Sequence, residues 1–506
     1  MSASREKKQR QSMDGMLTEK ERKEAAEAQK TKNKHIAYAV IGVVAVVLVA
    51  ALLIWDSGII QRGQAAKTVA LTVGDQTFTA ADLDFYYFQN YQTMAQYGIV
   101  NASTNLKEEA SMFGEGTWHE SFLESAKTSL TQVGVLCSEA QKAGYTISED
   151  GKATVQANVD SMKSAAKQNN FSYSKFLQLN YGTYMTPEAF ERCLEMAVLA
   201  DEYQAEKTGQ FPVEESEMTA YYEEHKDELD LITYTVYTID GAAESTTDAD
   251  GNTVDPTEEE KTAAMEAAKD NADAIAEMLK DKRTPSESDL TSYKATATAT
   301  ESEASGSSLS SNYSEWLLGS RKDGDVTVIE GTDCYYAVQF LGRESYLDAN
   351  DYDPRNVRYM LIRAEVDEGA SEPTEEQMNA AKATADDLLA QFQAGEQTGE
   401  AFAALAEANS DKIYQSNLME NVPEGSTTED FNAWLYDSAR KAGDSGVVVD
   451  NYYGGHHVVY FEGVSEDGTV WRQNLTATLQ NTAFSDWLTE TSGTYTVTDG
   501  DMTYVG

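Results

Sequence analysis

Hydrophobic and polar positions follow two different periods along this chain. Near the start of its polar body, the stretch VALTVGDQTFT from Val69 alternates like two short strands joined by a turn at Gly74. Apolar residues then recur three or four positions apart to about residue 227, most clearly in Glu120–Ala143 and Pro187–Tyr203. Helices with such apolar stripes must pack on each other, so the pattern predicts a helical domain over residues 67–228. The aromatic run FYYF at residues 85–88 is expected in its core.

The second half of the chain repeats one order of elements. Each copy has an alternating strand, a helix that opens on Pro-Thr-Glu-Glu, and a closing segment with a Trp-Leu pair, a basic turn with Gly-Asp and an apolar last strand. The matching segments are Leu231–Asp240 and Asn356–Ala364, residues 256–279 and 373–392, and Tyr313–Gly342 and Phe431–Gly463. Pro256 lies 117 residues before Pro373, and Tyr336 lies 121 residues before His457. Near-equal spacing predicts tandem α+β domains over residues 229–346 and 354–465.

Two further segments depart from this frame. Residues 284–312 are rich in Ser, Thr and Ala and contain few large apolar side chains, so we predict a mobile insert there. After the second copy, residues 466–506 show a helical pattern near Thr476–Leu488, a short strand at Tyr495–Val497, a turn at Asp499–Asp501 and a further strand at Met502–Val505.

One long apolar run, Ile36–Trp55, contains no charged residue and has the length that a helix needs to cross about 30 Å of hydrocarbon. Residues 1–35 carry ten Lys and Arg and six Asp and Glu, whereas the remainder is strongly acidic, so the positive-inside rule predicts a cytoplasmic tail and an extracytoplasmic body. A cleavable signal peptide is the alternative, but its apolar core would be about 7 to 15 residues long. We expect an uncleaved transmembrane anchor over residues 36–55.

Net charge limits the class of partner, and cysteine content limits the possible disulfide bonds. The chain has 39 Lys and Arg against 85 Asp and Glu, a net charge of −46, which argues against nucleic acid as a partner because phosphate binding needs clustered cations. The cysteines, Cys137, Cys193 and Cys334, are too few for a disulfide framework. We expect all three cysteines to be small buried residues. A disulfide bond between Cys137 and Cys193 is the alternative.

Several motifs resemble a known family. The opening TVGDQTFTAADLDFYY and the segment FPVEESEMTAYYEEHK at residues 211–226 resemble the helical chaperone domain of SurA/PrsA-type foldases. Residues 354–465 resemble a parvulin-type peptidyl-prolyl isomerase domain, through VRYMLI, AFAALA with the following Ser410-Asp411, and Ala-Gly-Asp before GHHVVYF. The first copy, residues 229–346, resembles this domain mainly because its pattern matches that of the second copy. The resemblance implies an α+β multidomain protein with a helical chaperone domain and two tandem parvulin-like domains, in which residues 466–506 return to the chaperone domain and pair near Val69–Val73.

The resemblance also suggests site residues. Parvulins place two histidines and a Cys or Asp beside an apolar proline pocket. His457 matches the second histidine, Tyr359 replaces the first, and Asp411 falls near the Cys/Asp position. Phe431 and Tyr436 match the aromatic residues of the pocket. Isomerisation lowers a barrier of about 18–20 kcal/mol by stabilising the twisted amide, so no metal or cofactor is expected.

Other interpretations of these residues stay open. His457 can equally be an interior strand residue bonded to a hydroxyl such as that of Tyr359. His456 should point to the opposite face and be solvated, and no further His or Cys stands at the spacing of a metal site. In the first copy, Tyr234 and Tyr336 occupy the positions of both histidines, so that domain is expected to bind peptide without isomerising it.

These patterns together predict a membrane-anchored, extracytoplasmic foldase in a Gram-positive-type envelope. Its expected partners are unfolded or nascent secreted polypeptides, with prolyl isomerisation at the second parvulin-like domain only. A non-catalytic chaperone and an envelope adaptor scaffold remain the alternatives.

Overall fold

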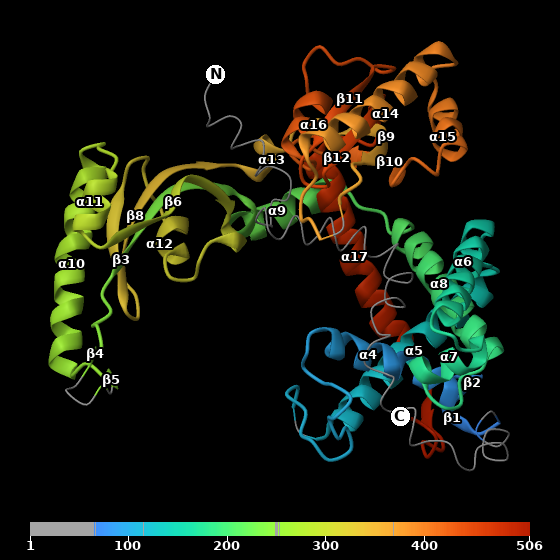
Figure 1. The fold of residues 1–506 in the computed structure, drawn as a ribbon. Coiled ribbons are helices and arrows are strands. Elements are labelled where there is room, and N and C mark those ends of the chain that lie inside the picture. Colours follow the sequence, from blue (N-terminus) through green and yellow to red (C-terminus); the bar gives the residue numbers. More distant parts are fainter. Residues whose placement is uncertain (1–64, 66, 115, 248–250, 252, 368) are drawn as a thin grey trace. The chain divides into compact units, whose positions relative to one another are not determined.

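The computed structural model describes residues 65, 67–114, 116–247, 251, 253–367 and 369–506. Within these residues no helix is long and apolar enough to cross a membrane. The predicted transmembrane helix at residues 36–55 and the predicted cytoplasmic tail lie outside the described residues. The described chain divides into two compact units: residues 65–213 together with Ala477–Gly506, and Glu214–Thr476 (Figure 1).

The first unit, here the helical unit, contains a small sheet and a helix bundle. Its elements are β1 (Val69–Val73), β2 (Gln76–Thr79), α4 (Ala80–Gln96), α5 (Trp118–Ala143), α6 (Glu149–Gln168), α7 (Tyr173–Tyr181), α8 (Pro187–Gly209), the second half of α17 (Val470–Ser492) and β13 (Val497–Asp499). Phe85, Tyr86 and Tyr87 are all buried in its core, as the sequence predicted for the aromatic run. Cys137 and Cys193 are buried and unbonded, and Cys334 is half-buried and also free.

The C-terminal segment completes the small sheet of the helical unit. Strand β13 pairs antiparallel with β1, with Leu71 opposite Asp499 and Val73 opposite Val497. The Lys127 ammonium lies 2.8 Å from the Asp499 carboxylate, and Val505 is buried in the bundle core. The strand lies two residues beyond the position that the sequence pattern suggested, and residues 502–505 form a turn. The pairing expected near Val69–Val73 is present.

The second unit contains α9 (Glu215–Leu229) and both copies of the repeated pattern, here the first and the second repeat. The first repeat consists of β3 (Leu231–Asp240), β4 (Thr246–Thr247), β5 (Thr253–Val254), α10 (Glu258–Lys280), α11 (Glu287–Ser292), β6 (Ala295–Ser305), the short 3-10 helix Gly306–Ser308, α12 (Ser314–Leu318), β7 (Val326–Glu330), β8 (Cys334–Glu344) and α13 (Tyr346–Ala349). The second consists of β9 (Arg355–Arg363), α14 (Glu375–Ala394), α15 (Gly399–Ala408), β10 (Gln415–Val422), α16 (Glu429–Leu435), β11 (Ser445–Asp450) and β12 (Gly455–Val464).

The two repeats have the same sheet. The strand order is β6-β3-β8-β7 in the first and β10-β9-β12-β11 in the second, and every pairing is antiparallel. Helix α10 packs on one face of the first sheet, and α12 packs on the other. In the second repeat α14 and α15 cover one face and α16 the other. The two repeats therefore share one strand order and one arrangement of covering helices.

Residues 284–312 are ordered, so the prediction of a mobile insert is wrong. They form α11 and β6, and β6 pairs with β3 from Leu231 opposite Ser305 to Ile239 opposite Ala295. Their scarcity of large apolar residues reflects an edge position, because only two of the eleven residues of β6 are buried and main-chain bonds to β3 hold the strand in place. An alternating Thr-Ala run is suited to such an edge strand, because only one of its faces is covered by the protein.

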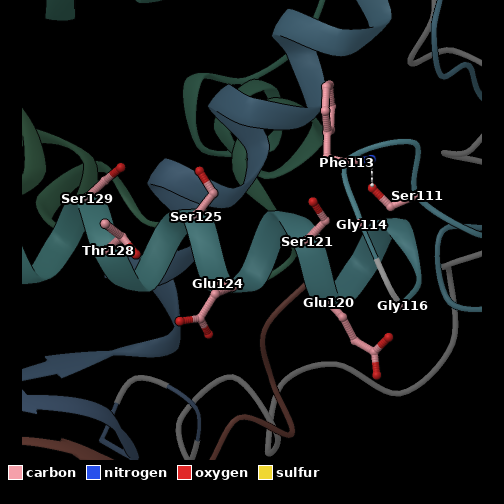
Figure 2. A pocket seen from close by; sticks show the side chains of 10 residues that line it. All are labelled: Ser111, Phe113, Gly114, Gly116, Glu120, Ser121, Glu124, Ser125, Thr128 and Ser129. Atoms are coloured by element: carbon pink, nitrogen blue, oxygen red, sulfur yellow. Dashed lines mark hydrogen bonds between the residues drawn. The ribbon is translucent and has the colours of Figure 1, made fainter.

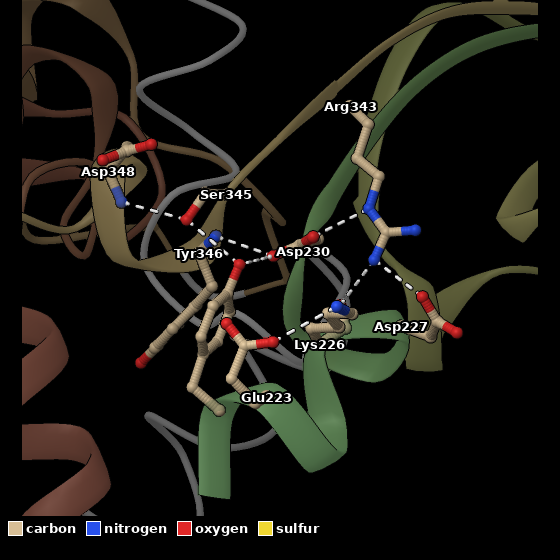
Figure 3. A network of polar contacts seen from close by, with 9 residues as sticks. Glu223, Lys226, Asp227, Asp230, Arg343, Ser345, Tyr346 and Asp348 are labelled. Atoms are coloured by element: carbon tan, nitrogen blue, oxygen red, sulfur yellow. Dashed lines mark hydrogen bonds and ion pairs between the residues drawn. The ribbon is translucent and has the colours of Figure 1, made fainter. Parts of the chain in front are cut away.

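A polar network joins α9 to the base of the first repeat (Figure 3). The Arg343 guanidinium, at the end of β8, donates to the carboxylates of Asp227 and Asp230, each at 2.7 Å. The other oxygen of Asp230 accepts from the Tyr222 hydroxyl at 2.8 Å and from the main-chain N–H of Tyr346 at 3.0 Å. These contacts explain why α9, which the sequence pattern assigned to the helical domain, groups with the repeats.

Candidate functional site

Three of the five expected site residues of the second repeat meet on the face of the sheet that α16 covers. His457 on β12 lies between Tyr359 on the neighbouring strand β9 and Phe431 on α16. Its ring centroid is 5.3 Å from that of Tyr359 and 5.2 Å from that of Phe431, and both contacts are edge-to-face. Tyr359, Phe431 and His457 are 3%, 2% and 6% exposed. The three rings fill the space between them, so a proline ring can reach His457 only if one of them moves.

The polar partner of His457 is a residue that sequence reasoning missed. The Nε2 atom of His457 lies 2.7 Å from the Oδ2 atom of Asp450, the last residue of β11, whose other oxygen accepts from the Tyr453 N–H. Burial acts to raise the pKa of Asp450, but the hydrogen bonds from His457 and from the Tyr452 and Tyr453 amides outweigh it and lower that pKa. Asp450 is thus ionised at neutral pH, and Nε2–H of His457 donates to it.

This arrangement differs from the interpretation in which a tyrosine hydroxyl bonds His457. Tyr359 contacts the imidazole with its ring, and burial raises the pKa of its phenol to about 12 against a hydrogen bond from Gln415. Within the described residues the Nδ1 atom of His457 is buried and has no hydrogen-bond partner. It is therefore the polar atom of the cluster that remains available to a ligand.

Asp411 and Tyr436 lie outside this cluster of three rings. Asp411 is exposed in the turn between α15 and β10, and the carboxylate at His457 belongs to Asp450. The Tyr436 hydroxyl donates to the carbonyl of Val422 at 2.6 Å, and the Arg355 guanidinium lies over its ring at 4.5 Å. Tyr436 therefore supports the end of α16. The sequence did contain a signal for Asp450, because a hairpin through Gly454 and Gly455 places position 450 diagonally across from position 457.

His456 is buried, which corrects the expectation that it is solvated. It points to the opposite face from His457, as alternation requires, but α14 covers that face and leaves the side chain 7% exposed. Burial and the nearby Lys382 lower its pKa, against the effect of Asp386. Among the residues that the structure describes, no cluster of His, Cys, Asp and Glu is placed to hold a metal ion.

The strand register shows which residues of the first repeat correspond to the site. Tyr336 takes the place of His457, and Tyr313 takes the place of Phe431, with an edge-to-face contact at 5.8 Å. Both sheets have a register shift beside a Phe, which aligns Tyr234 with Val357 and Val236 with Tyr359. The proposed equivalence of Tyr234 and Tyr359 is therefore wrong by two residues, because spacing along the chain does not fix which residues pair across the sheet.

The helical unit carries a different kind of site. A hollow of about 800 Å³ lies between the loop after α4 and the first half of α5. Figure 2 shows Ser121, Ser125 and Ser129 along one side of α5, while Glu120 and Glu124 point the other way. The Phe113 side chain borders the hollow and is 61% exposed, and its neighbour Met112 is 65% exposed. Sequence periodicity did not indicate this surface, since it belongs to a loop.

Comparison with known proteins identifies two of the domains. Residues 7–204 match the family of the SurA-like N-terminal domain, and residues 360–463 match the family of the PPIC-type PPIASE domain. The chain thus contains a SurA-like N-terminal domain and a parvulin domain of the PpiC type, joined in one mixed helix-and-sheet protein. The second match covers the second repeat.

Solved structures of chaperones and a foldase are also similar to the chain. Two come from work on PEB4 and Cj1289, described as SurA-like chaperones of Campylobacter jejuni. One is 15% identical, with 38% of this chain and 69% of that chain covered and a TM-score of 0.14; the other is 11% identical, with 70% and 99% covered and a TM-score of 0.17. The PrsA foldase of Lactococcus lactis is 15% identical, with 55% and 78% covered and a TM-score of 0.17. Comparison with curated proteins finds no match.

Proposed function

We propose that this protein is a membrane-anchored extracytoplasmic chaperone that holds unfolded or nascent secreted polypeptides in a Gram-positive-type envelope. Its SurA-like and PpiC-type domains support a foldase or chaperone. The proposed organisation is a cytoplasmic tail (1–35), an anchor (36–55), a chaperone domain (67–228), a degenerate parvulin-like domain (229–346), a parvulin-like domain (354–465) and a returning segment (466–506). The acidic body and the apolar run before it support the proposed orientation.

The observation that carries this proposal is the exposed pair Met112 and Phe113 beside the hollow on α5. Most large apolar side chains of the described chain are buried, whereas these two adjacent ones are more than half exposed at the rim of a recess. The recess is lined by the hydroxyls of Ser121, Ser125 and Ser129, which can accept the main-chain N–H groups of an unfolded chain. Such a grip is weak at one point and strengthens when several sites hold the same chain.

An aggregation assay tests this function. Full-length protein in lipid nanodiscs should delay the light scattering of a chemically denatured test protein after dilution. The double variant Met112→Ser/Phe113→Ser should lose at least half of that delay, because it removes the apolar contact surface. Tyr414→Ser, at a 53% exposed aromatic residue of the second repeat, serves as the matched control and should retain the delay. If the unaltered protein fails to slow aggregation, the proposed function is wrong.

The PpiC-type match favours a second function, prolyl isomerisation by the second repeat. His457 would then contact the proline segment after Phe431 moves aside, while Asp450 holds the imidazole in place. NMR exchange spectroscopy of an Ala-Pro peptide measures the rate. Acceleration by the full-length protein should disappear in His457→Ala and persist in Tyr336→Ala, the equivalent change in the first repeat. If the unaltered protein gives no acceleration, the second repeat serves binding alone.

A further inference from the structure

Residues 500–506, here the latch, follow β13 and lie against the helical unit. The main-chain N–H groups of Gly500 and Asp501 donate to carbonyls of β1, each at 2.9 Å. At the other end of the latch, Val505 is 2% exposed and belongs to the core of the bundle. Main-chain bonds therefore hold the beginning of the latch, and its end depends on the seat of the last two residues.

Gly506 sits on polar side chains from α4, α5 and the loop between them. Its N–H donates to the Oδ1 atom of Asp84 on α4 at 2.9 Å, and its carbonyl accepts from the Lys107 ammonium at 3.5 Å. Its φ angle is 82°, and a Cβ at this position would lie 2.8 Å from the His119 ring and 2.9 Å from the Cζ atom of Tyr87. The seat thus fits a glycine and holds it by its main chain.

The Asp84 carboxylate is the buried polar group of this seat. It is 1% exposed, and its Oδ2 atom lies against Gly182, where a Cβ would approach it to 2.5 Å. Within the described chain, the Gly506 N–H is the one hydrogen-bond donor to this carboxylate. A buried ionised carboxylate is stable when it accepts two or three hydrogen bonds, so a single donor favours the protonated acid.

The titratable groups around Asp84 set the sign of its response to pH. Burial raises the pKa of Asp84 to about 8, against the Gly506 N–H and the nearby Lys107 ammonium, which lower it. Tyr87 stays neutral, because burial and Asp84 raise the pKa of its phenol. The Nδ1 atom of His119 lies 3.0 Å from the Tyr87 hydroxyl, and burial and Lys107 lower the pKa of the imidazole. Ionisation of Asp84 thus disturbs the seat as the pH rises, whereas protonation of His119 would disturb it as the pH falls.

We propose that the latch is a pH-dependent strap, seated while Asp84 carries a proton and released as this carboxylate ionises. Opening the latch lets water solvate the charged carboxylate, which the single N–H of Gly506 cannot replace. The acid holds its proton more tightly under the seated latch than in water. The ratio of open to seated molecules therefore rises by up to about tenfold per pH unit between about pH 4 and pH 8, and then levels off.

Release of the latch changes the surface next to the exposed Phe113. A row of aromatic contacts leads there from the seat of Gly506, since Tyr87 contacts Phe122, Phe122 contacts Trp118, and Trp118 contacts Phe113. The ring centroids along this row are 5.5 to 5.7 Å apart. Because Gly506 covers the Tyr87 ring at the inner end of the row, an open latch increases the aromatic surface that the helical unit presents to solvent.

Hydrogen–deuterium exchange of the full-length protein in lipid nanodiscs tests the latch. The measured quantity is the protection factor of the Val505 and Gly506 amides, the ratio of the intrinsic to the observed exchange rate, which corrects for the pH dependence of exchange itself. It should fall about 100-fold from pH 5 to pH 7 and level off above about pH 8. The amides of α5 should stay at least tenfold better protected at every pH, which separates local release from unfolding of the helical unit.

Two substitutions of acids provide a matched pair. Asp84→Asn should remove the pH dependence, because the amide oxygen still accepts from Gly506 and does not ionise. Asp501→Asn is the control, since this acid is exposed on the latch itself and its side chain accepts the Thr503 N–H at 3.0 Å. It should retain the 100-fold fall. If Asp84→Asn does not fold, the pH profile of the unaltered protein decides the inference.

The outcomes are distinct. A protection factor that stays constant from pH 5 to pH 8 in the unaltered protein overturns the latch, and so does an equal fall in Asp84→Asn. Loss of protection towards acidic pH assigns the response to His119 and overturns the role of Asp84. A fall towards high pH that Asp84→Asn abolishes and Asp501→Asn retains supports the inference. The aggregation assay measures client binding, so its result is independent of these.

Discussion

At the scale of single residues, the buried pair of His457 and Asp450 separates the two repeats more sharply than any other contact. The first repeat has Gly331 at the position of Asp450 and Tyr336 at that of His457, so it lacks both members. A buried carboxylate without its donor is strongly destabilising, which makes the pair interdependent. The loss of both together in the first repeat is consistent with a sheet kept for binding.

A second buried acid, Asp84 on α4, lies in the helical unit. Its side chain is 1% exposed, and its Oδ1 atom accepts from the main-chain N–H of Gly506 at 2.9 Å. Burial raises its pKa to about 8, against the opposing effects of that hydrogen bond and of Lys107. Because the folded-state pKa lies above the usual value of 3.8, the protonated form favours folding, and this contribution is lost as the pH rises from about 4 to about 8.

Asp84→Asn should therefore stabilise the helical unit at pH 7 and above. The amide still accepts from Gly506 and needs no proton, so the gain reaches an upper limit of about 4 kcal/mol at pH 7 and vanishes near pH 4. Urea unfolding, monitored by hydrogen exchange of the α4 amides, measures this gain in the free energy of unfolding at pH 4 and at pH 8. The control Asp150→Asn, at an exposed acid of α6, should show no such pH dependence. An equal effect of Asp84→Asn at pH 4 and pH 8 would contradict the argument.

At the scale of elements, the closing segments of the repeats show how local sequence sets local structure. Gly324 and Gly443 have φ angles of 93° and 92°, and each donates its N–H to the carbonyl of a Phe on the last strand at 2.8 Å. In both copies an arginine lies over the Trp ring of the Trp-Leu pair and donates to the carbonyl of that Trp. The Gly-Asp turn marks this unit because a left-handed residue is required there.

The pairing of β13 with β1 leads to a prediction at the same scale. Deletion of residues 495–506 removes this strand and the buried Val505, so the amides of Val69–Val73 should exchange at least tenfold faster and the helical unit should melt at a lower temperature. Lys127→Met breaks the ion pairs with Asp499 and Glu124 and should cost less than about 1 kcal/mol. Unchanged exchange of β1 after the deletion would show that the returning segment contributes nothing to the sheet.

At the scale of the whole molecule, the proposed mechanism needs separate weak sites on one chain. The hollow on α5 is lined by hydroxyls and bordered by exposed apolar residues. An unfolded polypeptide that contacts several such exposed surfaces at once binds with an effective affinity above that of one contact alone. The net charge of −46 keeps such a surface soluble.

The sequence predicted most elements because periodicity is a local property. It located β3 at Leu231–Asp240 without error, placed α5 within two residues, and identified the tandem repeat from spacing. It failed at residues 284–312, where an edge strand has no large apolar residues, and at Tyr234, whose counterpart in the second repeat is set by strand pairing. Both failures arise because edge position and register depend on strands that are far away in sequence.

The sequence by itself thus determined the order of elements, the repeated unit, the family resemblance and the residues that could form a site. Only the tertiary structure decided that Asp450 bonds His457 and that Tyr359 and Phe431 pack against His457. The position of a residue in the repeating sequence pattern decides which face of a strand or helix its side chain occupies. Its contacts depend on how distant strands pair and on the volume of the residues packed opposite.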